Sequence, residues 1–121
     1  MSTQRLLVVD DSKVSRMMIG AIVKKLRPEW EISEAISGDE ALAIIAEAPP
    51  TLVSMDVNMP GINGVEAAGR IRAHHPDIRI VLCTANIQDA VKQAAERAGI
   101  KFVAKPITPA AIEQMVALFE S

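Results

Sequence analysis

Several apolar stretches of this chain end in a side chain that can hold a metal ion or a phosphoryl group. These side chains are Asp10 and Asp11 after the run 6–9, Asp56 after the run 52–55, Thr84 after the run 78–83, and Lys105 after the run 102–104. Carboxylates are preferred ligands of hard divalent cations, and ammonium and hydroxyl groups bind phosphoryl oxygens. These residue types indicate metal-assisted phosphate chemistry, provided that the fold brings them together.

The position of each group at the end of an apolar run supports such a meeting. Short apolar runs followed by turn residues are typical of buried strands, and the carboxyl ends of parallel strands lie at one edge of their sheet. Three carboxylates gathered there would raise one another's pKa unless a cation shared the site, and Mg²⁺ fits that role. Aspartate is a known nucleophile in acyl phosphate formation. We therefore expect phosphoryl transfer to Asp56, with the metal and Lys105 neutralising the charge of the transferring group.

Each of these residues also has a simpler explanation. Asp56 could stabilise the turn that follows it, and Asp10 and Asp11 could cap the next helix. Thr84 could be an ordinary strand residue, and Lys105 a solvated loop charge. Their joint placement at successive strand ends favours a site.

The elements that must position these residues alternate between strand and helix over the whole chain. We expect strands at 6–9, 30–33, 52–56, 78–83 and 102–104, and helices between Ser12 and Pro28, from Ser37 to Pro49, at 64–73, at about 88–98, and from Thr108 to the C-terminal end. Such alternation predicts parallel strands with right-handed crossovers and helices on both faces. The predicted architecture is a doubly wound five-stranded α/β sheet in one domain, residues 1–121.

Local signals set the helix ends and the inward faces. Ser37 and Glu40 have capping-box spacing, Gly99 is placed to end a helix, and Thr108 is placed to begin one. We expect the methionines of the first and last helices to lie in the core. In the first helix the expected inward residues are Val14, Met17, Met18, Ala21 and Ile22, and in the last they include Met115.

Composition narrows the class of protein. The chain has 121 residues, 50% hydrophobic and 23% charged, with a net charge of -2, which gives no electrostatic reason to expect binding to nucleic acid or to an anionic membrane. The single cysteine, Cys83, excludes an internal disulfide and fits a reducing compartment. No long apolar segment or signal peptide is present, so we expect a cytoplasmic protein.

Taken in order, these motifs resemble the response-regulator receiver domain, the CheY-like module of bacterial two-component signalling. The similarity covers nearly the whole chain and is carried by Asp10-Asp11, Met55-Asp56-Val57-Asn58-Met59-Pro60-Gly61, Gly64, Thr84-Ala85 and Lys105-Pro106. The resemblance implies the flavodoxin-like strand order 2-1-3-4-5.

The resemblance also implies residue roles. Asp56 would be the phosphoacceptor and, with Asp11 and the backbone carbonyl of Asn58, a ligand of Mg²⁺, while Asp10 would act largely through water. Lys105 would pair with the phosphoryl oxygens.

Other positions would serve the switch. Thr84 would move inward to bind a phosphoryl oxygen, Phe102 would be the aromatic residue that changes rotamer, and the bond before Pro106 would be cis. Asn58 and Asn86 occupy positions that tune dephosphorylation in relatives.

The resemblance further implies a partner surface. A histidine kinase or phosphotransfer protein would supply the phosphoryl group, and a downstream protein would bind the face made by the fourth helix, fifth strand and fifth helix. Candidate residues on that face are Gln88, Val91, Lys92, Ala95, Lys101, Phe102 and Pro106. We expect a monomer, with a dimer as the alternative.

We therefore expect a phosphorylation-activated switch that signals by protein–protein interaction as a stand-alone receiver, in chemotaxis or a phosphorelay, and not an enzyme acting on other substrates. One alternative is a receiver domain cut from a larger regulator. Another is an aspartate-nucleophile phosphohydrolase, although Asn58 stands where such an enzyme needs a second acid. A flavodoxin-like cofactor binder is disfavoured because no phosphate-binding loop follows the first strand.

Overall fold

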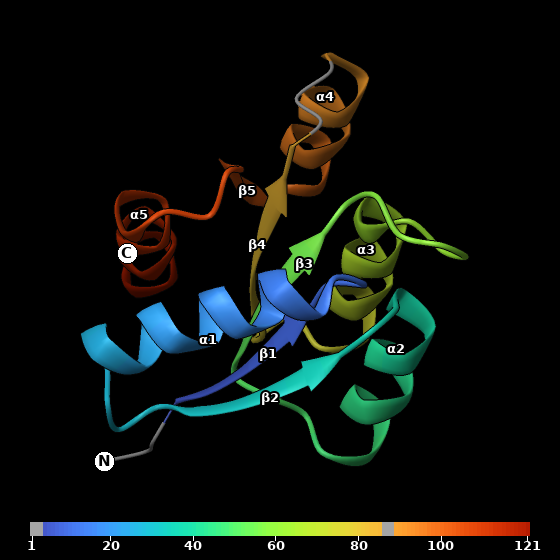
Figure 1. Cartoon of the computed structure of the whole chain (residues 1–121). Coiled ribbons are helices and arrows are strands. Elements are labelled where there is room, and N and C mark those ends of the chain that lie inside the picture. The colour runs from blue at the N-terminus through green and yellow to red at the C-terminus, as the bar shows by residue number, and fades with distance from the viewer. Residues whose placement is uncertain (1–3, 86–88) are drawn as a thin grey trace.

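A computed structural model describes residues 4–85 and 89–121 of the chain (Figure 1). The strands are β1 (Arg5–Val9), β2 (Glu31–Ala35), β3 (Leu52–Asp56), β4 (Arg79–Thr84) and β5 (Lys101–Ala104). The helices are α1 (Lys13–Leu26), α2 (Gly38–Glu47), α3 (Gly64–His74), α4 (Asp89–Ala98) and α5 (Pro109–Glu120). The expected alternation of strand and helix is confirmed; the expected start of the fourth helix at Gln88 lies outside the described residues.

The strands form one parallel sheet in the order β2-β1-β3-β4-β5, as expected. In the pairing of β3 with β4, Asp56 lies opposite Cys83, and in that of β4 with β5, Thr84 lies opposite Ala104. The strand ends are thus aligned in register. All residues that follow a strand are delivered to the same edge of the sheet.

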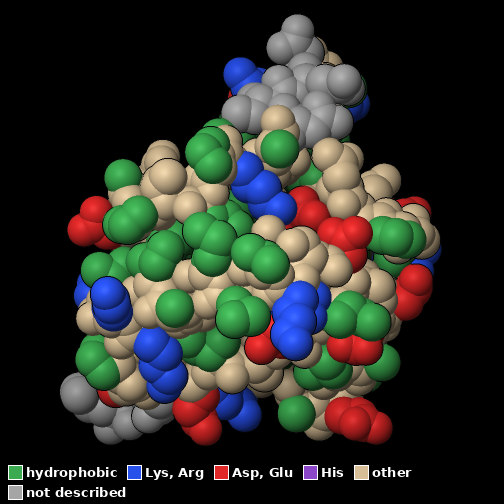
Figure 2. Space-filling model, in the orientation of Figure 1, with side chains coloured by type: hydrophobic (Ala, Val, Ile, Leu, Met, Phe, Trp, Pro, Cys, Tyr) green, Lys and Arg blue, Asp and Glu red, His purple; other side chains and the backbone are tan. Residues whose placement is uncertain are grey.

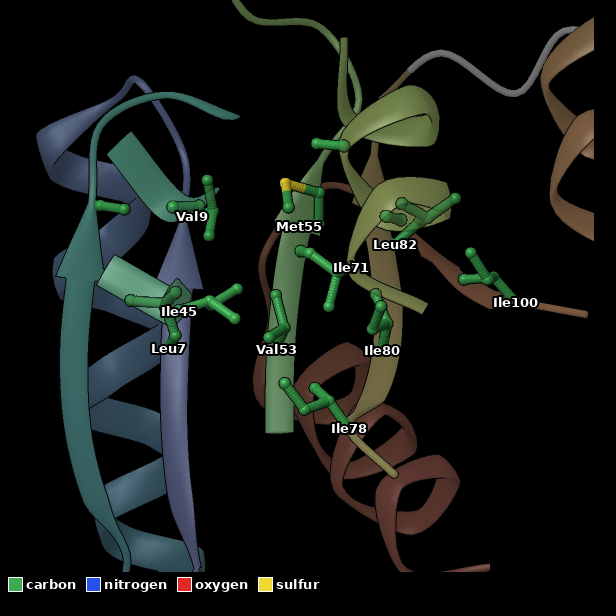
Figure 3. Packing of buried hydrophobic residues seen from close by; sticks show 14 of the residues in the cluster. Leu7, Val9, Ile45, Val53, Met55, Ile71, Ile78, Ile80, Leu82 and Ile100 are labelled. Atoms are coloured by element: carbon green, nitrogen blue, oxygen red, sulfur yellow. The ribbon is translucent and has the colours of Figure 1, made fainter. Parts of the chain in front are cut away.

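The core has two layers because strand side chains alternate between the two faces of the sheet. One layer contains Leu7, Val53 and Leu82 with residues of α2, α3 and α4, and Figure 3 shows these side chains converging between sheet and helices. The other contains Leu6 and Val81 with residues of α1 and α5. Helices therefore cover both faces, which explains why the central strands β1, β3 and β4 are buried along nearly their whole length, whereas the edge strand β2 carries Glu31, Ser33 and Glu34.

Helix ends follow the sequence signals. Ser37 Oγ accepts a hydrogen bond from Glu40 N at 3.0 Å, and Thr108 Oγ1 accepts one from Ala111 N at 3.1 Å. Gly99 has φ +70°, a conformation that favours glycine and ends α4. At α1 the N-cap is Ser12, so capping does not explain Asp10 and Asp11.

The prediction for the inward face of α1 is wrong at four of its five residues, and only Ile22 is half-buried and packs against the core as expected. Val14, Met17 and Met18 are 65%, 59% and 43% exposed, and Ala21 is exposed as well. The buried residues of this helix are Ile19 and Val23. Figure 2 shows hydrophobic side chains across the outer surface of α1. Met115 of α5, by contrast, is fully buried, as expected.

Across the two described ranges of the chain, no helix has the length and apolar character needed to span a bilayer.

Candidate functional site

Three carboxylates meet at the carboxyl edge of the sheet. Asp10 directly follows β1, Asp56 is the last residue of β3, and each offers an oxygen within 4.8 Å of the others and of an Asp11 oxygen. Asp10 and Asp56 are 1% and 6% exposed, whereas Asp11 is exposed. The acids are therefore arranged with two partly enclosed members and one at the surface. The described residues contain no other cluster of at least three acidic, histidine or cysteine side chains that could hold a metal.

Lys105 follows β5 and points into this cluster. Its Nζ donates a hydrogen bond to Asp10 Oδ2 at 3.0 Å and lies 3.8 Å from Asp56 Oδ1. One ammonium group cannot balance three carboxylates, and buried charge without compensation is costly. A divalent cation would supply the missing positive charge, and carboxylate oxygens are the donor set that Mg²⁺ prefers. The residues thus fit such an ion.

The pKa values of the two central groups reflect this crowding. Burial, above all, raises the pKa of Asp56 to about 6, with a further contribution from the charge of Asp10, against the opposing charge of Lys105 and a backbone hydrogen bond from Asn58. Burial lowers the pKa of Lys105, but its hydrogen bond to Asp10 and the charges of Asp56 and Asp10 outweigh this, so its pKa is raised. Lys105 therefore stays charged at neutral pH, while Asp56 loses its proton at a higher pH than an ordinary aspartate does.

Asp10 is held by hydrogen bonds to both its backbone and its side chain. Its backbone N donates to Ala35 O at 3.1 Å, and its Oδ1 accepts from Ser12 N at 2.9 Å. Its backbone O accepts from Arg16 Nη1 at 2.8 Å, and Arg16 Nε also donates to Glu34 Oε1 at 2.7 Å. Arg16 and Glu34 were not found from the sequence. One signal was available in the sequence. Helix N-termini usually favour acidic residues, but the first turn of α1 has none and Arg16 lies near its start.

The remaining predicted site residues lie nearby. Thr84 ends β4, is buried, and its backbone O accepts a hydrogen bond from Lys105 N at 2.9 Å. The Lys105–Pro106 peptide bond is cis, as expected. Phe102 is half-buried in β5 and packs against the core layer under α4. Asn86 lies outside the described residues.

The loop after β3 folds tightly back onto Asp56. Gly64 N donates to Val57 O at 3.0 Å. A Cβ at Gly64 would overlap the Asp56 carbonyl oxygen and lie 2.8 Å from the Asp56 carbonyl carbon and from Val57 Cα. Only glycine allows α3 to begin this close to the end of β3.

Most of the residues predicted for the partner face are at least partly exposed. Lys92, Lys101 and Pro106 are exposed, and Val91 and Phe102 are half-buried. Ala95 is fully buried against the core, so it is not available to a partner. Its position on the inner side of α4 is the physical reason for this error. Gln88 lies outside the described residues.

Cys83 lies beneath the acidic cluster, opposite Asp56 in the sheet register, and is buried. Burial raises the pKa of its thiol to about 11, against the opposing charge of Lys105. The thiol is therefore protonated and weakly nucleophilic, as expected of a small core side chain.

The doubly wound sheet with an acid cluster and a lysine at its carboxyl edge is the architecture of a two-component signalling domain. The model of the response regulator receiver domain family matches residues 6–117, and the chain belongs to this family.

Individual relatives agree with this assignment. The chain is 37% identical over 111 residues to chemotaxis protein CheY of Thermotoga maritima, covering 90% of this chain and 91% of that protein. It is 37% identical over 95 residues to response regulator GacA of Pseudomonas viridiflava, covering 78% of this chain but only 44% of that protein.

Solved structures share the fold. Vibrio cholerae CheY4 has a TM-score of 0.85 and 26% identity, covering 96% of this chain and 98% of that chain. Thermotoga maritima TrrA, solved in complex with Mg²⁺ and BeF, has a TM-score of 0.85 and 31% identity, covering 97% of this chain and 99% of that chain.

Proposed function

We propose that this receiver domain accepts a phosphoryl group on Asp56 from a histidine kinase or phosphotransfer protein, and that it works as a switch. The observation that carries this proposal is the meeting of Asp10, Asp11 and Asp56 within 4.8 Å, with Lys105 against two of them. Such a site suits a dianionic group that arrives together with a divalent cation.

In the proposed reaction a carboxylate oxygen of Asp56 attacks the phosphorus of a phosphohistidine donor. The new P–O bond forms as the donor's P–N bond breaks, and the electron pair of that bond returns to the imidazole nitrogen. Lys105 neutralises charge on the phosphoryl oxygens, and the Thr84 hydroxyl at the end of β4 donates a hydrogen bond to one of them. The domain thereby catalyses only its own phosphorylation and dephosphorylation.

Mg²⁺ is the proposed cofactor. Asp11, Asp56 and the Asn58 backbone carbonyl would hold it directly, and Asp10 largely through water. When bound, it supplies positive charge to the transferring group. TrrA, a structural neighbour, was solved with Mg²⁺ and BeF, which supports this choice.

The signal would pass to a protein partner, without direct binding to nucleic acid. Phosphorylation adds charge and acceptor oxygens at a buried edge, which biases a two-state element. We assign that element to Thr84, Phe102 and the α4–β5–α5 face, and we propose that the protein is a cytoplasmic monomer, with Asn58 and Asn86 setting the phosphoryl lifetime. CheY of Thermotoga maritima is matched along nearly its whole length, which supports a stand-alone receiver; GacA is matched along less than half, which keeps a receiver within a larger regulator as the alternative.

Intact-mass spectrometry after incubation with phosphoramidate and Mg²⁺ tests the phosphoacceptor. We expect one added phosphoryl group per chain, none with EDTA, and none in Asp56→Ala, because the nucleophile or the balancing charge is then missing. Modification that persists in Asp56→Ala would contradict the assignment. Continuous turnover of a phosphate monoester, instead of one stoichiometric addition, would favour a phosphohydrolase.

Phe102→Ala tests the switch. Since Phe102 carries no hydroxyl, coupling from the site to the partner face must act by packing. We expect phosphoramidate to modify this variant at the wild-type rate, whereas the partner discriminates less between its phosphorylated and unphosphorylated forms. Equal discrimination by variant and wild type, measured as a ratio of binding affinities, would remove Phe102 from the mechanism.

A further inference from the structure

Arg16 contacts the site through its side chain, and the proposed reaction does not use it. It belongs to the beginning of α1, and its side chain is only 12% exposed. Helical side chains run back toward the helix N-terminus, which lets this guanidinium reach Asp10 in the segment between β1 and α1. Nη1 donates to the backbone oxygen of Asp10 at 2.8 Å, and Nε donates to Glu34 of β2 at 2.7 Å.

The bond to the Asp10 carbonyl acts on Asp11. The carbonyl belongs to the planar peptide group that joins the two residues, so fixing its direction fixes where the Asp11 Cα and side chain leave the strand. Asp11 is the exposed member of the acid cluster, and unlike Asp10 it is not enclosed by the strand ends. Its place within 4.8 Å of the other acids therefore depends on this peptide plane.

We propose that Arg16 is a positioning residue, which holds the Asp10–Asp11 peptide so that Asp11 faces the metal position. Glu34 holds the guanidinium from the β2 side and offsets its charge. The inference rests on the proposed function only in naming Mg²⁺ as the ion. The partners of ligands to a metal commonly tune its affinity in this way.

Charge and position predict opposite effects for this residue. A guanidinium near the acid cluster repels a divalent cation, so by charge alone its removal would tighten Mg²⁺ binding. If Arg16 instead orients Asp11, its removal weakens binding. The sign of the change in affinity separates the two accounts.

Calorimetric titration of Mg²⁺ into the Arg16→Met variant measures the Kd and so gives the sign of the change in affinity. We expect the Kd for Mg²⁺ to rise by about tenfold. The Kd of Arg16→Lys should lie between those of wild type and Arg16→Met, because one ammonium group cannot bridge both Asp10 and Glu34. Arg70→Met is the matched control, since Arg70 lies on α3 and its contact is an exposed pair with Glu66; we expect its Kd to equal that of wild type. An equal or lower Kd in Arg16→Met would overturn the proposal.

Two further readouts keep the test decisive. With phosphoramidate, the Mg²⁺ concentration for half-maximal rate should rise in Arg16→Met while the rate at saturating Mg²⁺ stays near that of wild type. If this variant does not fold in EDTA, Arg16→Lys replaces it, and a wild-type Kd in Arg16→Lys overturns the proposal.

The second readout needs no metal. Ser12 N donates to Asp10 Oδ1, so release of the Asp10–Asp11 peptide should speed hydrogen exchange of the Ser12 amide in metal-free Arg16→Lys or Arg16→Met. Unchanged exchange refutes positioning even if the protein binds no Mg²⁺. Failure of Asp56 phosphorylation with changed exchange would refute the proposed function alone.

Discussion

Replacing Asp56 by Asn is expected to stabilise the metal-free protein by about 2 to 3 kcal/mol at pH 7, even though it abolishes phosphorylation. The raised pKa of Asp56, about 6 against the ordinary 3.8, means that the fold disfavours its charged form. The amide removes that charge and keeps the shape. Urea unfolding in EDTA measures the difference.

The pH dependence of this effect has a definite sign. Between about pH 4 and pH 6 the folded state retains a proton on Asp56 that the unfolded state has lost, so wild-type stability falls as pH rises. Above pH 6 both states are ionised and the loss is complete. The stability difference between Asp56→Asn and wild type should therefore be small at pH 4 and reach its full size above pH 6.

An exposed carboxylate provides the control. Asp77 lies on the surface between α3 and β4, and Asp77→Asn should change stability by less than about 0.5 kcal/mol. An Asp56→Asn variant no more stable than wild type at pH 7 in EDTA would contradict the conclusion that the fold disfavours the charged form of Asp56. Added Mg²⁺ should stabilise wild type more than the variant, since the ion binds the charged form.

Gly64→Ala should destabilise the protein by about 3 kcal/mol or more, because the new methyl group would overlap the backbone of Asp56 rather than a side chain that could move away. Relief of the overlap must displace the end of β3 or the start of α3. We therefore expect slower phosphorylation as well, measured with phosphoramidate at saturating Mg²⁺, alongside a lower unfolding midpoint.

Gly69 of the same helix is the matched control. A Cβ at Gly69 would meet nothing within 4 Å, so Gly69→Ala should stabilise α3 by up to about 1 kcal/mol through its better helix propensity. Stabilisation by both substitutions would show that the loop after β3 has room to adjust, and would contradict the requirement for glycine at position 64.

The sheet and the acid cluster could be predicted from the sequence because both depend on local patterns. The central strands are largely apolar, and the residue that ends or directly follows each strand is the one that reaches the sheet edge. Asp10, Asp56 and Lys105 therefore meet as expected, although they are far apart along the chain. Register did not need to be known, since parallel strands align their carboxyl ends.

The orientation of α1 could not be predicted in the same way. Its sequence carries two overlapping apolar stripes, one through Val14, Met17 and Met18 and another through Ile19 and Val23. Helical periodicity fits both. Packing against the sheet and α5 selects the second, and Arg16, one turn before Ile19, lies on that stripe and reaches Asp10 only in this orientation. Contacts between distant elements thus decided what the local pattern left open.

The buried thiol beneath the acids can report on transient opening of the sheet edge. Since Cys83 is enclosed and protonated in the native state, an alkylating reagent reaches it only through transient opening of the sheet edge. The labelling rate of this single cysteine thus converts into the free energy of that opening. The same rate compared with and without a phosphoryl group would measure how far modification stabilises the sheet edge against opening.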